Sequence, residues 1–408
     1  MGREGRRPLR VLAADDSKVM RSVLATLFEL HASHGDASLP RMELCGLVSD
    51  GEEALAAVRR LNPDVLLLDL EMPRMNGLEV LKQLRILAPT LPVIMCSAHT
   101  ERGARSTLDA LTHGAKDYVM KPGQQKDFAA AMDSLMEQLL PKIAALAGWG
   151  LVRLEPRELT LAEKRAAALD REASALRTPR TTALVETGAP VELVVIGVST
   201  GGPSALEVML PMLPRDFAVP VMIVQHMPVL FTVALAERLD RICGLKVRQA
   251  TDGVAVRRGE VWLAPGDAHM EIVPGISRVG ELNPVVKLHQ RPALNSCKPS
   301  ADYLFRAASE MYGAGTLALV MTGMGSDGFD GARAVRAAGG FVVAQDEATS
   351  AVWGMPGRVA REGVANAVVG LPSIAGALLQ RVQEGQEGQE GQRITSGTAG
   401  REVMHGVL

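Results

Sequence analysis

The residue best suited to nucleophilic chemistry is a serine in a glycine-rich turn. Residues 194–206 read VVIGVSTGGPSAL, so Ser199 follows an apolar run and precedes a helix-like segment. This fits G-x-S-x-G in the strand-to-helix context that a nucleophilic serine needs. A phosphate-binding loop needs a lysine after its second glycine and a dinucleotide loop needs G-x-G-x-x-G, and neither pattern is present here. A glycine turn that only redirects the chain is the remaining alternative.

A nucleophilic serine also needs a base, because a neutral hydroxyl attacks poorly until an imidazole takes its proton. Three histidines are candidates: His226, His269 and His289. His226 directly follows VPVMIVQ, at the carboxyl end of the next predicted strand and therefore at the same sheet edge as Ser199. His269 begins an extended run and His289 lies in a strand or loop. The sequence favours His226 as the base, with a purely structural histidine as the alternative.

The third member is an acid that orients the base. The segment LALVMTGMGSDGFDG supplies Asp327 after a predicted strand and a glycine-rich turn. Asp330 is the nearest competitor, but it fits a helix N-cap or a first-turn acid that needs no catalysis. The resulting order, Ser199 then His226 then Asp327, differs from the Ser, Asp, His order of α/β-hydrolases. We therefore expect the triad on a different fold.

A second group of polar residues stands at predicted strand ends in the first part of the chain: Asp15, Asp16, Asp69, Ser97 and Lys121. The carboxyl ends of neighbouring parallel strands meet at one edge of the sheet, so these residues should converge. Three close carboxylates repel unless a divalent cation lies among them, and oxygen ligands suit Mg²⁺. The lysine and the hydroxyl would steady a phosphoryl group on one carboxylate. A turn with an N-cap is the simpler alternative for any single acid.

Two α/β domains would position these groups. Residues 9–140 alternate apolar runs (LRVLAA, MELCGLV, VLLLDL, PVIMCSA, DYVM) with helical spacing, and residues 191–380 do the same (ELVVIGV, VPVMIVQ, GEVWLAP, TLALVMT, GFVVAQD). This alternation predicts doubly wound folds with mainly parallel sheets. Residues 141–190 are charged and alanine-rich and indicate a linker. Residues 381–408, with three QEG repeats, are predicted to be a disordered tail.

Composition excludes several classes of function. The 408 residues carry a formal net charge of -2, which favours neither nucleic acid nor a membrane surface as a partner. The four cysteines form no CxxC pair, so no metal cluster or disulfide framework can be inferred from their spacing. No apolar run approaches the ~18 residues of a membrane span, and the amino terminus lacks a signal peptide. We expect a cytoplasmic protein without membrane insertion.

The segments AADDSKVMRSVL, LLLDLEMPRMNGLEVL, CSAHT and DYVMKP resemble the receiver domain of two-component response regulators. The resemblance implies a flavodoxin-like fold with Asp69 as the phosphoacceptor and a sensor histidine kinase as the phosphodonor. It also implies Mg²⁺ held by Asp15 and Asp16 together with Asp69, helped by the backbone carbonyl of Glu71. Ser97 and Lys121 would contact the phosphoryl group, and Tyr118 fills the aromatic switch position.

The segments IGVSTGGPSAL, VQHMP, LAPG and TGMGSDG resemble the catalytic domain of chemotaxis protein-glutamate methylesterases. With the receiver, the resemblance spans residues 9–380. It implies hydrolysis of glutamate γ-methyl esters on chemoreceptors with release of methanol, and deamidation of receptor glutamines. Ser199 would be the nucleophile, His226 the base and acid, and Asp327 the orienting acid, with Thr200 and Met324 lining the oxyanion site. No cofactor is expected for this step, and a monomer is expected.

Two other interpretations remain open from the sequence. The second domain could be a non-catalytic scaffold in which GVSTGG is only a turn, or the same hydrolase could serve a chemosensory pathway other than chemotaxis. A further hypothesis concerns regulation: the unmodified receiver would cover the edge that bears Ser199, and phosphorylation of Asp69 would weaken that packing.

Overall fold

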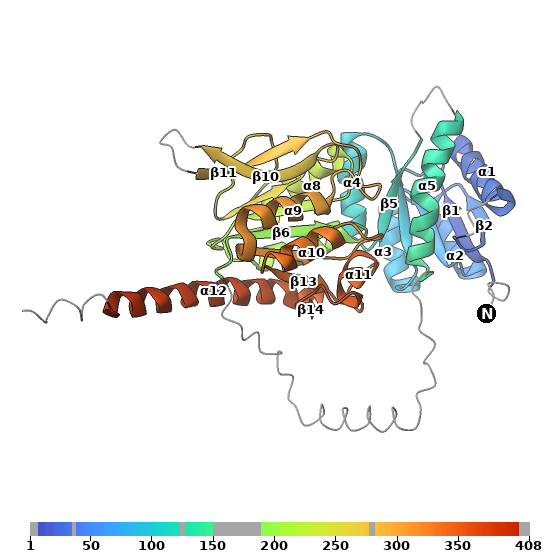
Figure 1. Ribbon diagram of the computed structural model, residues 1–408. Coiled ribbons are helices and arrows are strands. Elements are labelled where there is room, and N and C mark those ends of the chain that lie inside the picture. The colour runs from blue at the N-terminus through green and yellow to red at the C-terminus, as the bar shows by residue number, and fades with distance from the viewer. Residues whose placement is uncertain (1–6, 35–37, 123–127, 150–188, 277–281, 400–408) are drawn as a thin grey trace, which may run out of the picture.

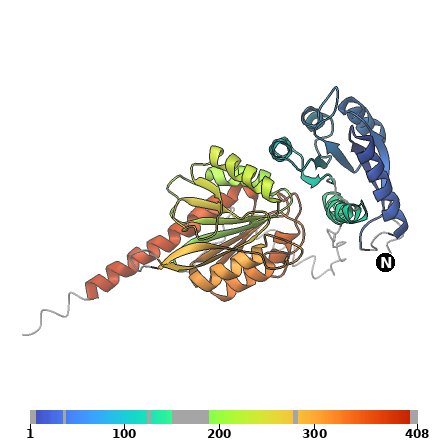
Figure 2. The same ribbon diagram turned by 90° about the horizontal axis from the view of Figure 1, so that it is seen from above.

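The computed structural model describes residues 7–34, 38–122, 128–149, 189–276 and 282–399. They form two α/β domains that lie side by side (Figure 1; Figure 2). The helix α12 leads away from the second domain on the side opposite the first (Figure 2).

The first domain is a five-stranded parallel sheet in the order β2-β1-β3-β4-β5. Its strands are β1 (Leu9–Ala14), β2 (Met42–Val48), β3 (Val65–Asp69), β4 (Val93–Ser97) and β5 (Asp117–Met120). Its helices are α1 (Lys18–His34), α2 (Gly51–Leu61), α3 (Gly77–Leu87), α4 (Glu101–Thr112) and α5 (Phe128–Leu146). The strand order is that of flavodoxin-like proteins, so the predicted fold class is confirmed.

The second domain has a seven-stranded parallel sheet in the order β14-β13-β12-β6-β7-β9-β8. The strands are β6 (Leu193–Val198), β7 (Val221–Gln225), β8 (Lys246–Gln249), β9 (Glu260–Leu263), β12 (Thr316–Val320), β13 (Phe341–Gln345) and β14 (Ala367–Val369). A separate antiparallel hairpin pairs β10 (His269–Ile276) with β11 (Leu282–His289). The helices are α7 (Gly202–Met209), α8 (Val229–Ile242), α9 (Ala301–Tyr312), α10 (Phe329–Ala337), α11 (Met355–Arg361) and α12 (Leu371–Ala399).

Burial explains why the central strands could be predicted from the sequence. Every residue of β6, β7 and β12 is buried, and parallel strands covered by helices on both faces appear as continuous apolar runs. The edge strands β8 and β14 are short and partly exposed, and the sequence did not reveal them.

The first domain extends beyond the predicted boundary at residue 140. Helix α5 continues through Pro141 to Leu146, because Leu139, Leu140 and Ile143 all lie in the buried core of this domain. The helical apolar stripe therefore outweighs the proline. Residues 150–188 of the predicted linker lie outside the described residues.

The predicted disorder of residues 381–408 is wrong for residues 381–399, which continue α12. Val382 is 3% exposed and packs into the core. Core contacts therefore hold the helix at the residue that directly precedes the first QEG repeat. Glutamine and glutamate are good helix formers, whereas each glycine costs about 1 kcal/mol relative to alanine. The Gln380 amide also donates to the Glu384 carboxylate one turn later, at 2.8 Å. Residues 400–408 lie outside the described residues.

Candidate functional site

Three adjacent central strands end at one edge of the second sheet, and each delivers a polar residue there. Strands β12, β6 and β7 are neighbours in register. Ser199 directly follows β6, His226 directly follows β7, and Asp327 lies in the loop between β12 and α10. Ligand and catalytic sites of open parallel sheets lie at such carboxyl ends.

The turn at Ser199 needs glycines because other segments of the chain approach it closely. A Cβ added to Gly202 would lie 2.0 Å from Gln225 Oε1, and one added to Gly323 would lie 2.8 Å from Ser199 Cβ. Gly201 has φ +77°, which glycine adopts without strain. The Ser199 amide donates to the Thr322 carbonyl at 3.0 Å, and this bond ties the turn to the β12 loop.

The His226 ring bonds to Asp327, as His226 Nε2 lies 2.8 Å from Asp327 Oδ2. Asp327 is 1% exposed and also accepts from the Ser300 hydroxyl and the Ala301 amide, each at 2.6 Å. Burial favours a raised pKa for Asp327, but the bonds from His226 and Ser300 outweigh it and lower that pKa. A fixed carboxylate holds the imidazole in one orientation.

The competitor Asp330 lies elsewhere. It is exposed in the first turn of α10, near Arg306 and Arg333. The structure therefore brings Asp327, rather than Asp330, to His226.

The second ring nitrogen of His226 faces a residue that sequence reasoning missed. Its Nδ1 lies 3.6 Å from the Cys297 sulfur. Burial alone lowers the pKa of His226, but the hydrogen bonds with Asp327 and Cys297 outweigh it and raise that pKa to about 10. Within the described part of the chain, no hydrogen bond joins the Ser199 hydroxyl to this ring.

The other two candidate histidines form a structural cluster on the hairpin. His269 and His289 are paired across β10 and β11, and their rings stack with centroids 5.1 Å apart. Both rings also contact Tyr303. His269 is fully buried and accepts from the Ser300 amide. These contacts leave His226 as the histidine at the Ser199 edge.

The two residues expected at the oxyanion site differ in their surroundings. Thr200 is buried, and its hydroxyl donates to Asp117 Oδ2 in the first domain at 2.6 Å. Met324 is half-buried in the β12 loop between two glycines. The Thr200 side chain therefore forms a hydrogen bond across the domain boundary.

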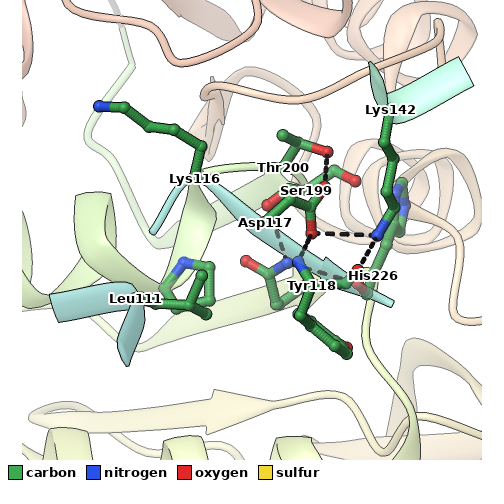
Figure 3. A pocket seen from close by; sticks show the side chains of 11 residues that line it. Leu111, Lys116, Asp117, Tyr118, Lys142, Ser199, Thr200 and His226 are labelled. Atoms are coloured by element: carbon green, nitrogen blue, oxygen red, sulfur yellow. Dashed lines mark hydrogen bonds and ion pairs between the residues drawn. The ribbon is translucent and has the colours of Figure 1, made fainter. Parts of the chain in front are cut away.

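A narrow pocket of about 20 Å³ lies between the two domains at this edge (Figure 3). The second domain lines it with Ser199, Thr200, Gly201, Pro203, Gln225 and His226, and the first domain with Leu111, Lys116, Asp117, Tyr118 and Lys142. This volume is enough for about one water molecule. The first domain therefore covers the Ser199 edge.

Asp117 is the central polar residue of this closure (Figure 3). One carboxylate oxygen accepts from Thr200, and the other accepts from Lys142 Nζ at 3.0 Å. Beside it, the Tyr118 ring stacks on Phe231 with centroids 4.4 Å apart. The predicted switch aromatic thus packs against the second domain.

A second polar cluster joins the domains along α4 and α8. Arg238 donates to Asp109 of the first domain, to Glu207 of its own domain at 2.5 Å and to Thr112 at 2.8 Å. Nearby, Arg105 donates to Glu237 at 3.2 Å. Arg238 therefore neutralises two carboxylates that face each other across the boundary.

The acidic residues of the first domain also converge. Asp15, Asp16 and Asp69 offer oxygens within 4.8 Å of one another, which fits the oxygen ligands that Mg²⁺ prefers. Lys121 Nζ lies 2.8 Å from a carboxylate oxygen of Asp15 and of Asp69. Ser97 is buried at the end of β4, where its hydroxyl accepts from Thr107 of α4 at 2.8 Å.

The fold destabilises the charged form of Asp69. Burial and the neighbouring Asp15 and Asp16 raise its pKa to about 6, although Lys121 acts in the opposite direction. A carboxyl group whose pKa is higher in the folded than in the unfolded state lowers stability as pH rises through that interval. The loss of folding stability caused by the ionised Asp69 is therefore fully present at neutral pH when no cation is bound.

We therefore expect Asp69→Asn to stabilise the metal-free protein at neutral pH by about 2–3 kcal/mol. Asp64→Asn is the matched control with the opposite sign, because hydrogen bonds from Arg7 and Arg10 lower the pKa of Asp64 despite its partial burial. Thermal unfolding with and without Mg²⁺ measures both. Equal stability of wild type and Asp69→Asn without Mg²⁺ would show that the three carboxylates do not strain the folded state.

Comparison with known proteins decides the family. Residues 194–378 match the family model "CheB methylesterase", and residues 11–133 match "Response regulator receiver domain". The protein-glutamate methylesterase/protein-glutamine glutaminase of Trichodesmium erythraeum is 39% identical over 91% of this chain and 99% of its own length. The chain belongs to this family. The namesake from a Nocardioides species is 40% identical over 92% of this chain and 95% of its own length.

A solved structure also resembles this methylesterase/glutaminase family member. The methylesterase catalytic domain of Thermotoga maritima CheB is 40% identical, covers 47% of this chain and 99% of that chain, and has a TM-score of 0.44. Among the described helices of the chain, none is long and apolar enough to cross a membrane.

Sequence reasoning missed three of the residues at the site of this methylesterase/glutaminase: Asp117, Lys142 and Cys297. Asp117 and Lys142 reach it only through domain docking, and Cys297 only through a turn thirty positions before Asp327. A search for titratable side chains near predicted strand ends would have found Asp117 alone, because it begins β5.

Proposed function

We propose that this protein hydrolyses glutamate γ-methyl esters on chemoreceptors, releasing methanol, and deamidates receptor glutamines to glutamate. The observation that carries the proposal is the His226–Asp327 pair, with Asp327 buried, beside Ser199 at the ends of adjacent strands. Family membership supports this activity over a non-catalytic scaffold. The four cysteines are free, which supports a reducing compartment, so we place the reaction in the cytoplasm. We propose that the enzyme acts as a monomer.

In the proposed mechanism, Ser199 attacks the ester carbonyl while His226 accepts its proton. Nε2 is held by Asp327, so Nδ1 is the nitrogen that takes the proton. Backbone N–H groups of Thr200 and Met324 would stabilise the anionic oxygen, a contribution of about 10²–10³ in rate per donor. His226 returns the proton to methanol, and water activated by the same imidazole then frees the glutamate. Deamidation follows the same path with ammonia as the leaving group.

The receiver would control access to Ser199. Asp15, Asp16 and Asp69 fit Mg²⁺, with the Glu71 carbonyl as a further ligand, and Mg²⁺ would neutralise the phosphoryl oxygens as a sensor histidine kinase donates to Asp69. Lys121 and Ser97 would contact the phosphoryl group. Ser97 is bonded to Thr107 of α4, and α4 packs against α7 and α8 at the domain boundary.

The docked arrangement is inactive for a steric reason. A cavity of about 20 Å³ cannot admit a glutamyl ester side chain. We propose that phosphorylation of Asp69 weakens the docking and exposes Ser199 to the receptor.

Methanol release from methylated receptor membranes tests the function. We expect release by the purified chain, faster with a small phosphodonor and Mg²⁺. No methanol under either condition would refute the esterase activity. Equal rates under both would refute control by the receiver.

The Cys297 contact leads to a prediction about pH. In a plot of kcat/KM against pH, the fall at low pH (the acid limb) reports the pKa of the catalytic base. Cys297 contributes to raising the pKa of His226. We expect Cys297→Ala to shift that limb of the phosphodonor-activated enzyme to lower pH, because His226 then loses its proton more readily. Cys243→Ala is the control and should leave the limb in place. Coincident limbs for wild type and Cys297→Ala would exclude this role.

A further inference from the structure

A cluster of nitrogen, sulfur and oxygen donors surrounds the ring of His226. His226, Cys297 and Asp327 each offer a possible metal-ligand atom, and these atoms lie within 4.8 Å of one another. A thiolate beside an imidazole favours Zn²⁺ over Mg²⁺. This donor set therefore differs in chemistry from the three carboxylates of the receiver.

The Cys297 thiol is held in place by a tight turn. Leu294 and Cys297 exchange two backbone hydrogen bonds, of 3.1 and 2.9 Å. The intervening Asn295 and Ser296 have φ angles of 53° and 61°, as a type I′ turn requires. The side-chain amide of Asn295 donates to the Asp302 carboxylate at 3.0 Å, which fixes the turn to the start of α9. The thiol and the imidazole are thus positioned by separate parts of the fold.

The distance between the two donors fits a tetrahedral zinc site. With Zn–S of about 2.3 Å and Zn–N of about 2.0–2.1 Å, tetrahedral geometry places sulfur and nitrogen about 3.5–3.6 Å apart. The Cys297 sulfur lies 3.6 Å from His226 Nδ1. Little movement of either side chain is therefore needed for both to reach one ion.

In this site Asp327 orients the His226 ring and does not itself bind the metal. Its oxygens already accept hydrogen bonds from His226, Ser300 and the Ala301 amide. Histidines that ligate a metal commonly donate their other ring N–H to a carboxylate, which fixes the tautomer and strengthens the ligand. The His226 Nε2 bond to Asp327 has this form.

We propose that His226 Nδ1 and Cys297 Sγ form a Zn²⁺ site that reversibly inhibits the esterase. The inference rests on the proposed function, because Nδ1 is the nitrogen that would accept the Ser199 proton. Zinc binding forms one Zn–S and one Zn–N bond, displaces four of the six water ligands of the aqueous ion to leave a tetrahedral site, and releases the thiol proton and any Nδ1 proton to solvent. No electron is transferred. The remaining zinc positions keep water.

Cobalt absorption on the full-length chain tests binding independently of activity. Cobalt replaces zinc in such sites, and a thiolate ligand gives a charge-transfer band in the near ultraviolet. We expect this band in wild type and in Cys243→Ala, with loss of the band on addition of Zn²⁺. Cys297→Ala should lack the band and bind Zn²⁺ at least about 10–100-fold more weakly. Cobalt at the receiver carboxylates gives no thiolate band.

Methanol release with Mg²⁺ and a phosphodonor provides the second readout. Zn²⁺ should inhibit wild type and Cys243→Ala, with recovery on chelation and restored Mg²⁺, and should inhibit Cys297→Ala only at concentrations at least about tenfold higher. Absence of the cobalt band in wild type, or equal zinc sensitivity of Cys297→Ala and Cys243→Ala, overturns the zinc site. A cobalt band in a chain that releases no methanol without zinc instead overturns the proposed function and leaves the metal site standing.

Discussion

Replacing Ser199 with alanine is expected to lower methanol release by about 10⁴–10⁶-fold, to the level left by the remaining groups of the site. The reason is that His226 and Asp327 have no nucleophile of their own to activate in this mechanism. The loss should appear in kcat rather than in receptor binding, because the hydroxyl acts only when the new bond forms. Single-turnover assays on methylated receptor membranes measure it.

The control for this substitution is Ser309→Ala. Ser309 is buried in α9 and donates to the Arg306 carbonyl, away from the Ser199 edge. It should leave the rate within about twofold. Both variants should still form the acyl phosphate on Asp69, which shows that each is folded.

Substantial activity in Ser199→Ala would contradict the proposed nucleophile. Cys297 would then be the next residue to test, because its sulfur lies 3.6 Å from His226 Nδ1 and thiols with an imidazole partner are strong nucleophiles. A scaffold without catalysis predicts instead that wild type and Ser199→Ala behave alike in every assay.

The positions of Ser199, His226 and Asp327 could be predicted because parallel sheets order their strand ends. Strands β12, β6 and β7 are continuous apolar runs, and short loops follow each of them. Adjacent strands in a parallel sheet place their carboxyl ends together whatever the details of side-chain packing. The same reasoning brought Asp15, Asp69 and Lys121 to one edge of the first sheet.

Contacts between domains could not be predicted in this way. Thr200 and Asp117 are 83 residues apart, and nothing local in either segment selects the other as a partner. Docking depends on the whole surface of two folded bodies. The ends of α5 and α12 were missed for a different reason: buried side chains such as Ile143 and Val382 outweigh the unfavourable Pro141 and the QEG glycines.

Replacing Arg238 with alanine is expected to activate the enzyme without phosphorylation. Arg238 joins Asp109 of the receiver to Glu207 of the catalytic domain, and its loss leaves two carboxylates facing each other across the boundary. Hydrogen bonds to charged groups contribute about 1.5–3 kcal/mol each, and Arg238 is only 20% exposed. Since 1.4 kcal/mol is about tenfold in an equilibrium, we expect basal methanol release to rise about 10–100-fold.

Arg241→Ala is the matched control for Arg238→Ala. Arg241 lies on the same helix, α8, and is exposed. It should leave the basal rate unchanged. The phosphodonor-stimulated rates of wild type, Arg238→Ala and Arg241→Ala should converge, because phosphorylation and Arg238→Ala act on the same docking equilibrium.

This convergence separates release of the receiver from damage to the fold. A variant that merely loosens the catalytic domain loses activity both with and without phosphodonor, whereas a released receiver raises only the basal rate. If Arg238→Ala lowers both rates, or leaves the basal rate at the level of Arg241→Ala, the α4–α8 contact does not restrain the enzyme. The narrow pocket around Thr200 and Asp117 would then have to be tested as the remaining barrier to the receptor.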